Sequence, residues 1–484
     1  MPFPFYATHR PEEPEGGCFA LSCNAPLYGQ GVTHSPDHPN LLDVEIRDLS
    51  NEGDGIGQSE GRIVFVEGAL PGERVETRLV GGSRGMLRGE LRTLHQASPE
   101  RRQPPCILAA DCGGCSLQHW SDRAQAQWKE QKVQQSLTRL GGLTITVEPI
   151  LAAEAVLGYR NRAIIPIQSG PHGFKAGFYR RHSHDVVNMN HCPVLDPRLD
   201  ALIAPLKQDL EATGWAPYNE ETRSGVLRHL VLRIGAHSGE ILLGLVVRDA
   251  SLDEATVLAE EWMERWPQVV GVVLNLQPKP TNTLLGPQNQ LLAGRPWLLE
   301  RFADRTFQIG LDTFFQVHTA QAERLIPLLR AGLQLKSGQV LLDGFCGIGT
   351  LSLPLLSPGV RLIGIEHQAS SVERARDNAR LNGLENAEFV AGGVDERLGE
   401  WLPMADALLL DPPRKGLSES LCETIAKEAP DRVAYVSCNP ATLARDLQRL
   451  TASGQLRLQS VQPLDFFPQT SHCEALALLV NGAS

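Results

Sequence analysis

The sequence predicts an α/β protein whose C-terminal part is a doubly wound, Rossmann-like sheet, preceded by a small β-barrel and a mixed α+β central region. Two observations predict this fold class. From about residue 335 onward, apolar strands alternate with amphipathic helices, which is typical of a mostly parallel sheet. Before residue 100, short strands are separated by glycine-rich turns, which is typical of a small barrel.

Four regions are expected along the 484 residues. Residues 1–40, rich in Pro, Gly, Asn and His, read as a disordered extension that carries Cys18 and Cys23. Residues 41–97 are assigned to the barrel, residues 98–300 to the mixed central region, and residues 301–484 to the doubly wound domain.

Each region has its own expected elements. The barrel strands are expected near Val44, Arg62–Val66, Val75–Leu79 and Arg88–Leu94, with a turn at Gly53–Gly57. The central region is expected to hold helices near Trp120–Leu140 and Leu199–Leu210 and strands at Arg228–Arg233 and Gly239–Val247.

The C-terminal domain shows the clearest alternation. Its strands are expected at Gln339–Asp343, Arg361–Glu366, Ala387–Ala391, Asp406–Asp411, Arg432–Ser437, Arg457–Val461 and Cys473–Val480. Its helices are expected at 349–356, 369–382, 417–428 and 440–452. The last two strands follow each other without a full helix between them, which indicates a closing antiparallel pair. Ligands of such sheets bind outside the carboxyl ends of the strands, so functional residues are expected at that edge.

Composition narrows the function classes. The formal net charge of -11 argues against a general polyanion binder, although a local basic surface stays open. No apolar run approaches the roughly 18 residues of a spanning helix, and no secretion signal is recognisable, so we expect no membrane association and a cytoplasmic location. The ten cysteines are unevenly spread, which favours metal or catalytic use over a disulfide framework. Nothing in the sequence indicates an oligomeric state.

A cofactor site is expected where the first strand of the sheet ends. Asp343 closes that strand, and Gly347 and Gly349 follow where the backbone would approach a ligand. Glu366 closes the next strand, about 20 residues on, where an acidic residue usually accepts ribose hydroxyls. The glycine spacing is not G-x-G-x-x-G, which disfavours a dinucleotide, and an Asp at the strand end before the glycines favours S-adenosylmethionine. The alternative is a tight turn with a solvated glutamate.

Four reactive groups are expected at the same edge farther along the chain. Asp411 and Arg414 follow one strand, Cys438 follows the next, and Glu474 begins the last. Pro440 opens a helix directly after Cys438, and the positive end of a helix dipole favours a thiolate. The alternative is an inert buried cysteine. Such a set suits methylation of a pyrimidine at C5: a thiolate adds at C6, C5 attacks the methyl group, and a carboxylate removes the C5 proton.

Several motifs resemble those of the RNA 5-methyluridine methyltransferase family: Phe314-Phe-Gln-Val317, Asp411-Pro-Pro-Arg-Lys-Gly416, Ser437-Cys-Asn-Pro-Ala-Thr442 and Phe467-Pro-Gln-Thr-Ser-His-Cys-Glu474. The resemblance runs from about residue 41 to the C-terminus and implies that the barrel is a TRAM domain. It implies Cys438 as the nucleophile and Glu474 as the base. The positions at which it implies contact with S-adenosylmethionine are Gln316, Phe345, Thr350, Glu366 and Asp411.

Four positions depart from the family pattern. Gly344 replaces a larger residue, His318 stands where Asn is common, Gly393 stands where Asp or Asn often contacts the adenine end, and Cys473 replaces a β-branched residue. These departures bear on cofactor contacts more than on the reaction.

A second cysteine set lies in the central region: Cys106, Cys112, Cys115 and Cys192. Four thiolates can hold a [4Fe–4S] cluster or zinc, and their spacing alone does not decide between the two. The resemblance to the rRNA-type members favours a [4Fe–4S] cluster with a structural or RNA-positioning role. The alternative is a group of unrelated thiols.

An RNA-contacting stretch is expected between Gly158 and His184, where there is no acidic residue. Cations and aromatics alternate there, which suits phosphate contact and base stacking. The residues concerned are Tyr159, Arg160, Arg162, Phe174, Lys175, Phe178, Tyr179, Arg180 and Arg181. The alternative is a solvated face with core aromatics.

Together these features predict a cytosolic S-adenosylmethionine-dependent enzyme that makes 5-methyluridine in RNA, with 23S rRNA as the preferred target and tRNA as the alternative. An amino-group methyltransferase of nucleic acids and an RNA-binding iron–sulfur protein without catalysis are the rival readings. A nicotinamide oxidoreductase is disfavoured by the glycine spacing.

Overall fold

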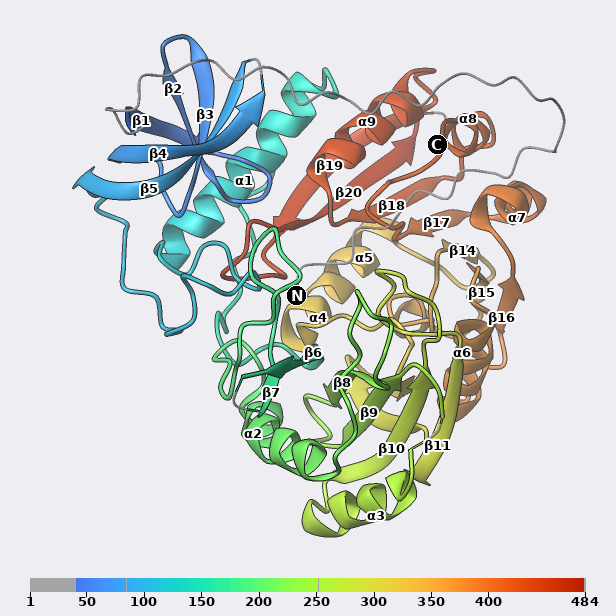
Figure 1. Ribbon diagram of the computed structural model, residues 1–484. Coiled ribbons are helices and arrows are strands. Elements are labelled where there is room, and N and C mark those ends of the chain that lie inside the picture. The colour runs from blue at the N-terminus through green and yellow to red at the C-terminus, as the bar shows by residue number, and fades with distance from the viewer. Residues whose placement is uncertain (1–40, 84, 172, 251, 483–484) are drawn as a thin grey trace, which may run out of the picture. The chain divides into compact units, whose positions relative to one another are not determined.

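The structure is a computed structural model that describes residues 41–482 apart from 84, 172 and 251 (Figure 1). The expected extension at 1–40, with Cys18 and Cys23, lies outside these residues. The described chain divides into two compact units, 41–99 and 100–482. Within the described ranges, no helix combines the length and the apolar character that crossing a membrane requires.

The first unit is a closed five-stranded barrel of order β1-β2-β3-β5-β4. Its strands are β1 (Leu41–Leu49), β2 (Gly55–Ser59), β3 (Arg62–Glu67), β4 (Arg74–Ser83) and β5 (Met86–Gln96). The expected turn at Gly53–Gly57 is wrong in its second half, because β2 starts at Gly55 and pairs with both β1 and β3. A Cβ atom at Gly57 would lie 2.3 Å from Val44 Cγ1, so glycine permits the close approach of the two strands.

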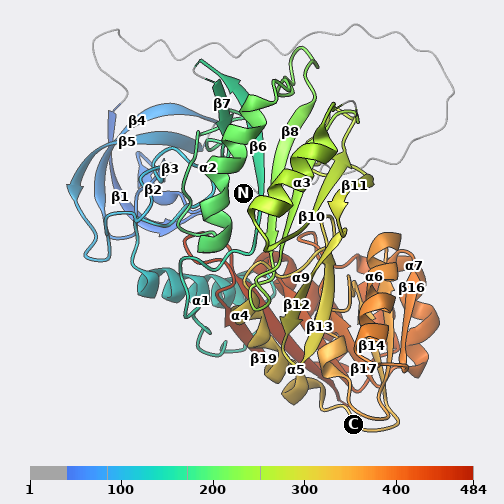
Figure 2. The same cartoon turned by 90° about the horizontal axis from the view of Figure 1, so that it is seen from below.

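The second unit contains two large sheets. One has the order β11-β10-β9-β8-β6-β7 and is covered by α2 (Pro197–Ala212) and α3 (Ala255–Arg265), as Figure 2 shows. Leu202 and Leu206 of α2 and Trp262 of α3 belong to the core of this sheet. Its strands are β6 (Arg162–Gly170), β7 (Gly173–Ala176), β8 (Leu227–Ile234), β9 (Ile241–Val247), β10 (Val269–Leu276) and β11 (Gln288–Gly294).

A hairpin and two helices follow this sheet along the chain. They are β12 (Trp297–Phe302), β13 (Arg305–Gly310), α4 (Thr319–Glu323) and α5 (Leu325–Leu333). The loop between β13 and α4 carries the Phe314-Phe-Gln-Val317 motif and leads into the C-terminal sheet.

The C-terminal sheet has the order β16-β15-β14-β17-β18-β20-β19. Its strands are β14 (Val340–Gly344), β15 (Arg361–Glu366), β16 (Ala387–Ala391), β17 (Ala407–Leu410), β18 (Arg432–Ser437), β19 (Leu456–Leu464) and β20 (Glu474–Asn481). Its pairings are parallel from β16 to β18, and β20 runs antiparallel to both of its neighbours. The doubly wound sheet with a closing antiparallel pair is therefore confirmed.

Helices pack on this sheet largely where they were expected. They are α6 (Ala369–Leu381), α7 (Val394–Trp401), α8 (Glu419–Lys427) and α9 (Pro440–Thr451). The expected helix at 349–356 is wrong: only a 3-10 turn, η1 (Leu353–Leu355), forms there, with Pro354 inside it. An earlier helix, α1 (Asp122–Arg139), lies beside α9 and contributes Val133 and Leu137 to the same core (Figure 1).

Candidate active site

The carboxyl edge of the C-terminal sheet gathers the expected functional residues. Asp343 lies at the end of β14, Glu366 ends β15, Asp411 follows β17, and Cys438 follows β18. Because β20 is antiparallel, its first residue, Glu474, lies at the same edge. The sheet order places β15 and β16 on one side of β14 and β17 and β18 on the other, which is the switch point where such sheets bind ligands.

The loop after β14 is shaped by left-handed backbone. Phe345 has φ 70°, Gly347 has φ 55° and Gly349 has φ 82°. The amide of Phe345 donates to Ile365 O at 3.0 Å, which holds the loop against β15. The non-glycine residue at positive φ is typical of a functional constraint.

Glu366 is oriented by the same loop. Its Oε2 accepts from Gly347 N at 3.1 Å and its Oε1 accepts from Gln368 N at 2.8 Å. The side chain is half-buried, and Thr350 lies buried at the far end of the loop. An oriented acid beside a glycine loop fits the ribose of an adenosine cofactor.

Gln316 joins the edge from a distant part of the chain. Its side chain is buried, and its Nε2 donates to Asp411 Oδ2 at 3.4 Å. Its carbonyl accepts from Asn161 Nδ2 at 2.9 Å, which ties the motif to the central sheet. The structure thus brings together two residues that the resemblance assigns to the cofactor.

Cys438 and Glu474 are neighbours at this edge. Ser437 pairs with Ala475 across β18 and β20, so the residues that flank this pair meet where the strands end. Helix α9 begins directly after Cys438, with Asn439 Oδ1 accepting from Ala441 N at 3.1 Å. The expected strand-to-helix junction is present.

The carboxyl groups of the edge favour their protonated forms. Burial, with smaller effects from Asp411 and Glu366, raises the pKa of Asp343 to about 8. Burial raises the pKa of Asp411 to about 7. Burial and the nearby Asp411 raise the pKa of Glu474 well above its ordinary value, which Arg414 opposes.

Burial also corrects the expectation that the start of the helix after Cys438 favours a thiolate. Burial, followed by the charges of Glu474 and Asp411, raises the pKa of Cys438 above its ordinary value, and only Arg414 and a backbone hydrogen bond oppose this. The helix start alone therefore does not produce a thiolate in the ligand-free protein.

Arg414 reaches His472, with 3.4 Å between Nη2 and Nδ1. The pKa of His472 is lowered to about 3 by burial and by Arg414 and nearby lysines.

Two departures from the family pattern concern glycines near the cofactor loop. At Gly344 a Cβ atom would lie 3.0 Å from Leu410 Cδ2 and 3.3 Å from Val394 Cγ1, so this packing suits glycine. Gly393 caps α7 without a side-chain hydrogen bond, and a Cβ atom there would approach only Glu396, at 3.4 Å or more. An Asp or Asn would therefore fit at Gly393.

The other two departures have structural roles. His318 is buried, stacks on Tyr159 with 4.4 Å between ring centroids, and accepts from Gln321 N at 3.4 Å as the cap of α4. Cys473 is buried in the core of the C-terminal sheet.

The second cysteine set is brought together in part. Cys106, Cys112, Cys115 and Cys192 are all free thiols. Burial, and then the neighbouring Cys192 and Cys112, raises the pKa of Cys115 to about 12. Burial raises the pKa values of Cys106 and Cys192, and the neighbouring Cys112 adds a smaller increase to each. The donor chemistry fits a four-thiolate group, but among the described residues no group of three or more His, Cys, Asp or Glu is arranged to hold a metal ion. The expected [4Fe–4S] cluster is not supported by this geometry.

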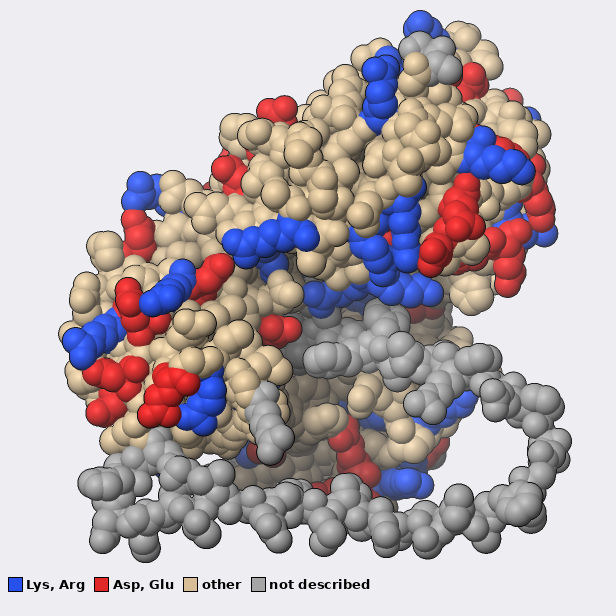
Figure 3. Space-filling model, turned by 90° about the horizontal axis from the view of Figure 1, so that it is seen from above, with Lys and Arg blue, Asp and Glu red and all other residues tan. Residues whose placement is uncertain are grey.

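The expected RNA-contacting stretch is wrong in part. Tyr159 and Phe178 are buried, so these aromatics are not available for stacking on bases. Arg162 donates to Leu311 O at 2.9 Å, and Arg180 pairs with Asp111. The face that Figure 3 shows carries a group of neighbouring Lys and Arg side chains, and elsewhere cationic and anionic side chains adjoin one another. RNA contact by the remaining cations of this stretch stays a prediction.

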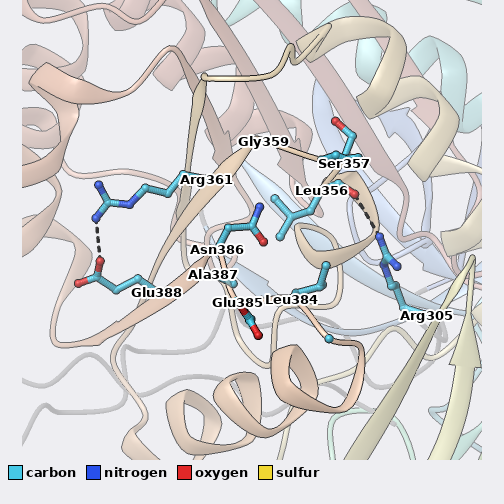
Figure 4. A pocket seen from close by; sticks show the side chains of 12 residues that line it. Arg305, Leu356, Ser357, Gly359, Arg361, Leu384, Glu385, Asn386, Ala387 and Glu388 are labelled. Atoms are coloured by element: carbon cyan, nitrogen blue, oxygen red, sulfur yellow. Dashed lines mark hydrogen bonds and ion pairs between the residues drawn. The ribbon is translucent and has the colours of Figure 1, made fainter.

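A pocket of about 780 Å³ lies away from the carboxyl edge. It is lined by Arg361 and Ala387, which begin β15 and β16, and by Arg305 (Figure 4). Arg361 is paired with Glu388 at 2.8 Å, and Arg305 donates to Leu356 O at 3.1 Å. These cations have protein partners, and no expected site residue lines the pocket.

Comparison with known proteins gives consistent matches. The family model described as tRNA (uracil-5-)-methyltransferase matches residues 301–481, and the TRAM domain model matches residues 41–91. An uncharacterised RNA methyltransferase of Parasynechococcus marenigrum is 44% identical, over 93% of this chain and 98% of the relative. One from Nostoc is 45% identical, over 92% of this chain and 97% of the relative.

A solved structure resembles the whole fold. The crystal structure of Pyrococcus abyssi tRNA (uracil-54, C5)-methyltransferase in complex with S-adenosyl-L-homocysteine has a TM-score of 0.74 and 26% identity. The match covers 90% of this chain and 99% of that one.

Proposed function

This chain belongs to the RNA (uracil-5-)-methyltransferase family, and from that membership we propose that it transfers a methyl group from S-adenosylmethionine to C5 of a uridine in RNA. One observation carries the proposal. A thiol, Cys438, and a carboxyl group, Glu474, flank a cross-strand pair at the carboxyl edge, beside the Asp411–Gln316 contact. An amino-group methyltransferase would need no such thiol.

The proposed cofactor site uses residues of the same edge. Glu366 accepts the ribose hydroxyls, Phe345 and Thr350 line the loop, and Gln316 and Asp411 lie toward the reacting centre. The cofactor supplies an electrophilic methyl group and a positive charge. Burial favours the uncharged forms of Asp343, Asp411 and Cys438. A positive charge at this edge would therefore shift all three groups toward their ionised forms.

The proposed reaction proceeds through Cys438. The Cys438 thiol first loses its proton to solvent. The thiolate sulfur then forms a bond to C6 of the uracil, and the electron pair of the C5–C6 double bond moves toward C5 and O4. C5 takes the methyl group, whose bond to the sulfonium sulfur breaks, so that S-adenosylhomocysteine leaves. Glu474 removes the C5 proton, the C5–C6 double bond forms again, and the bond between sulfur and C6 breaks. Splitting the reaction in this way replaces one difficult step with easier ones.

The RNA target has two candidates. The combination of a TRAM domain with the four-cysteine set supports 23S rRNA, by resemblance to the rRNA-type members. The match to the Pyrococcus abyssi tRNA enzyme supports tRNA as the second candidate. Mass mapping of 5-methyluridine in rRNA and tRNA, from cells with and without this protein, distinguishes the two, since the site left unmethylated identifies the substrate.

Trapping of the covalent adduct tests the chemistry. With 5-fluorouridine at the target position there is no C5 proton to remove, so the methylated enzyme–RNA adduct should persist on a denaturing gel. Glu474→Gln should accumulate the adduct with ordinary RNA, and Cys438→Ala should give neither adduct nor product while still binding RNA. Methylation that survives Cys438→Ala would disprove the covalent mechanism.

We also propose that Cys106, Cys112, Cys115 and Cys192 bind a [4Fe–4S] cluster, on the basis of their donor chemistry and of the resemblance to the rRNA-type members of the family. Iron and acid-labile sulfide should each reach about four per chain in protein purified without oxygen. Cys112→Ala should lose both. Stoichiometric zinc without iron would contradict the assignment.

A further inference from the structure

The loop between β19 and β20 delivers Glu474 to the carboxyl edge. It runs through residues 465–473, and Glu474 is the first residue of β20. We propose that Gln469 is a positioning residue that holds this loop, and with it Glu474, against the chain segment that carries Cys106, Cys112 and Cys115. The proposal rests on the proposed role of Glu474 as the base.

Gln469 has an unusual backbone and complete burial. Its φ is 69° and its exposed fraction is 0%. A non-glycine residue in the left-handed region is unfavourable and persists only where its surroundings determine it. Glycine or asparagine would relieve the backbone cost, so the side chain must supply something that they do not.

The side-chain amide of Gln469 is bonded at both of its ends. Its Oε1 accepts from Arg102 Nη2 at 2.9 Å and from Gln125 Nε2 at 3.1 Å. Its Nε2 donates to Asp122 Oδ1 at 2.8 Å. Arg102 and Asp122 are themselves paired through two contacts of 2.7 Å. Gln469 Nε2 also donates to Val156 O at 3.4 Å. The other side-chain members of this network, Arg102, Asp122 and Gln125, all come from one segment of the chain.

The backbone of Gln469 joins the same segment. Its amide donates to Gln125 Oε1 at 3.0 Å, and its carbonyl accepts from Leu117 N at 3.0 Å. Gln125 thus holds both the backbone and the side chain of one residue. This double contact fixes the position and the direction of the loop together.

Other contacts anchor the loop on both sides of Gln469. Lys129 Nζ donates to Phe467 O at 3.0 Å, Tyr159 Oη to Pro468 O at 3.1 Å, Lys132 Nζ to Ser471 O at 3.0 Å, and Ser471 N to Ser116 Oγ at 3.0 Å. These bonds leave the loop little freedom between Phe467 and Ser471, three residues before the base.

The anchoring segment also holds the thiols. Ser116 and Leu117 follow Cys115 directly, and Gln118 Oε1 accepts from Cys106 N at 3.1 Å. A displacement of this turn would therefore be passed through Ser116 and Leu117 to Ser471 and Gln469. The structure in this way connects the cysteine segment to the base, although the two are far apart in sequence.

The expected effect is specific to one step. Within residues 41–482, apart from the three gaps, no hydrogen bond joins Gln469 or its partners Arg102, Asp122 and Gln125 to Cys438 or Asp411. Addition and methyl transfer should therefore proceed. Removal of the C5 proton should slow, since it depends on the placement of Glu474. A misplacement of the base by about 1 Å can lower a rate by about 100-fold.

Gln469→Asn tests the proposal, because asparagine tolerates positive φ but is one methylene shorter. The unchanged protein and the variant are compared with ordinary substrate RNA in single-turnover reactions and on denaturing gels. We expect the release of methylated RNA to fall by about 10-fold to 100-fold, with accumulation of methylated adduct and with the affinities for RNA and for the cofactor unchanged. Gln462→Asn is the matched control, because Gln462 lies on β19 and donates to Pro149 O at 2.6 Å, outside the network. It should not accumulate adduct.

The outcomes separate this inference from the function. If the unchanged protein gives neither product nor adduct with rRNA or tRNA, the proposed function fails. If it methylates RNA but Gln469→Asn releases product at the same rate, or loses adduct and product together, the positioning role fails alone. Should Gln469→Asn not fold, Ser116→Ala decides in the same way, since it removes a single contact to Ser471. Adduct accumulation in that variant supports the inference, and its absence contradicts it.

Discussion

At the scale of single residues, burial dominates the chemistry of the carboxyl edge. Asp343 is 2% exposed and Glu474 is 3% exposed, and each lies near Asp411. Acidic groups that share a water-poor site cannot all ionise at ordinary cost, so their pKa values rise. The folded, ligand-free protein therefore holds protons at this edge that the unfolded chain would release at neutral pH.

These protons predict that the free energy of unfolding depends on pH, in part through the titration of Asp343. Its pKa is raised to about 8 in the folded protein, against about 3.9 in an unfolded chain. The stability that it contributes is fully present below the unfolded pKa and is lost as pH rises through the folded pKa, so the free energy of unfolding should fall across this window. Asp343→Asn should reduce the fall between about pH 5 and about pH 9 by at least about 1.4 kcal/mol, the free energy of one pKa unit.

The measurement is urea unfolding of the cofactor-free protein at both pH values. Asp431→Asn serves as the control, because the Asp431 side chain is exposed. An unchanged fall in Asp343→Asn would show that the Asp343 carboxyl is ionised at neutral pH in the folded state.

Single residues also show where the sequence was insufficient. Cys438, Glu474, Glu366 and Asp411 could be placed at one edge, because strand ends and strand order follow from the sequence pattern. Gln316 lies in a loop and was assigned to the cofactor by the family resemblance alone. Their raised pKa values could not be predicted, since they depend on burial by distant segments. Tyr159 and Phe178 were expected to stack on bases and are buried instead. The sequence could not separate these two cases, because aromatic residues occur both at RNA-binding surfaces and in protein cores.

At the scale of elements, the strands and helices with a clear apolar pattern were predicted correctly, whereas elements with a weak pattern were not. The bounds of β15, β16 and β18 agree with the expectation, because each is a short apolar run between turn residues. Helix α7 was missed, since it is only eight residues long, contains Gly399 and has no side-chain cap. The packing of α1 onto the C-terminal sheet could not be predicted, since it joins segments about 300 residues apart.

The contacts that attach α1 to the C-terminal sheet predict that replacing one lysine of α1 lowers the stability strongly. Lys129 is fully buried, and its Nζ contacts Asp465 Oδ1 at 2.6 Å and Phe467 O at 3.0 Å. Lys129→Met should lower the free energy of unfolding by about 3–5 kcal/mol, because it leaves a buried carboxylate without its partner. Replacing Asp465 with Asn in the same chain should recover part of this loss.

Denaturant unfolding measures both variants. Lys427→Met, at an exposed position of α8, is the control and should change little. A loss below about 1 kcal/mol in Lys129→Met, the range of an exposed ion pair, would mean that water reaches the pair.

At the scale of the whole molecule, each compact unit has a core of its own. The barrel core is formed by Val44, Ile46, Val64, Val66, Ala69, Val75 and Leu87. The cores of the two large sheets are formed by other residues, all from the second unit. Separate cores are the physical requirement for units that fold independently.

Removal of the barrel should therefore separate cofactor binding from RNA binding. A chain of residues 100–484 should fold and bind S-adenosylmethionine with unchanged affinity, because every proposed cofactor residue lies in the second unit. Small barrels of this kind often bind oligonucleotides, so the affinity for RNA should fall by roughly tenfold, about 1.4 kcal/mol. Calorimetry with the cofactor and filter binding with RNA, at one salt concentration, measure the two effects.

An insoluble fragment would show that the second unit needs the barrel in order to fold. Unchanged RNA affinity would assign RNA binding to the second unit alone, where the cations between Gly158 and His184 would be the next residues to replace.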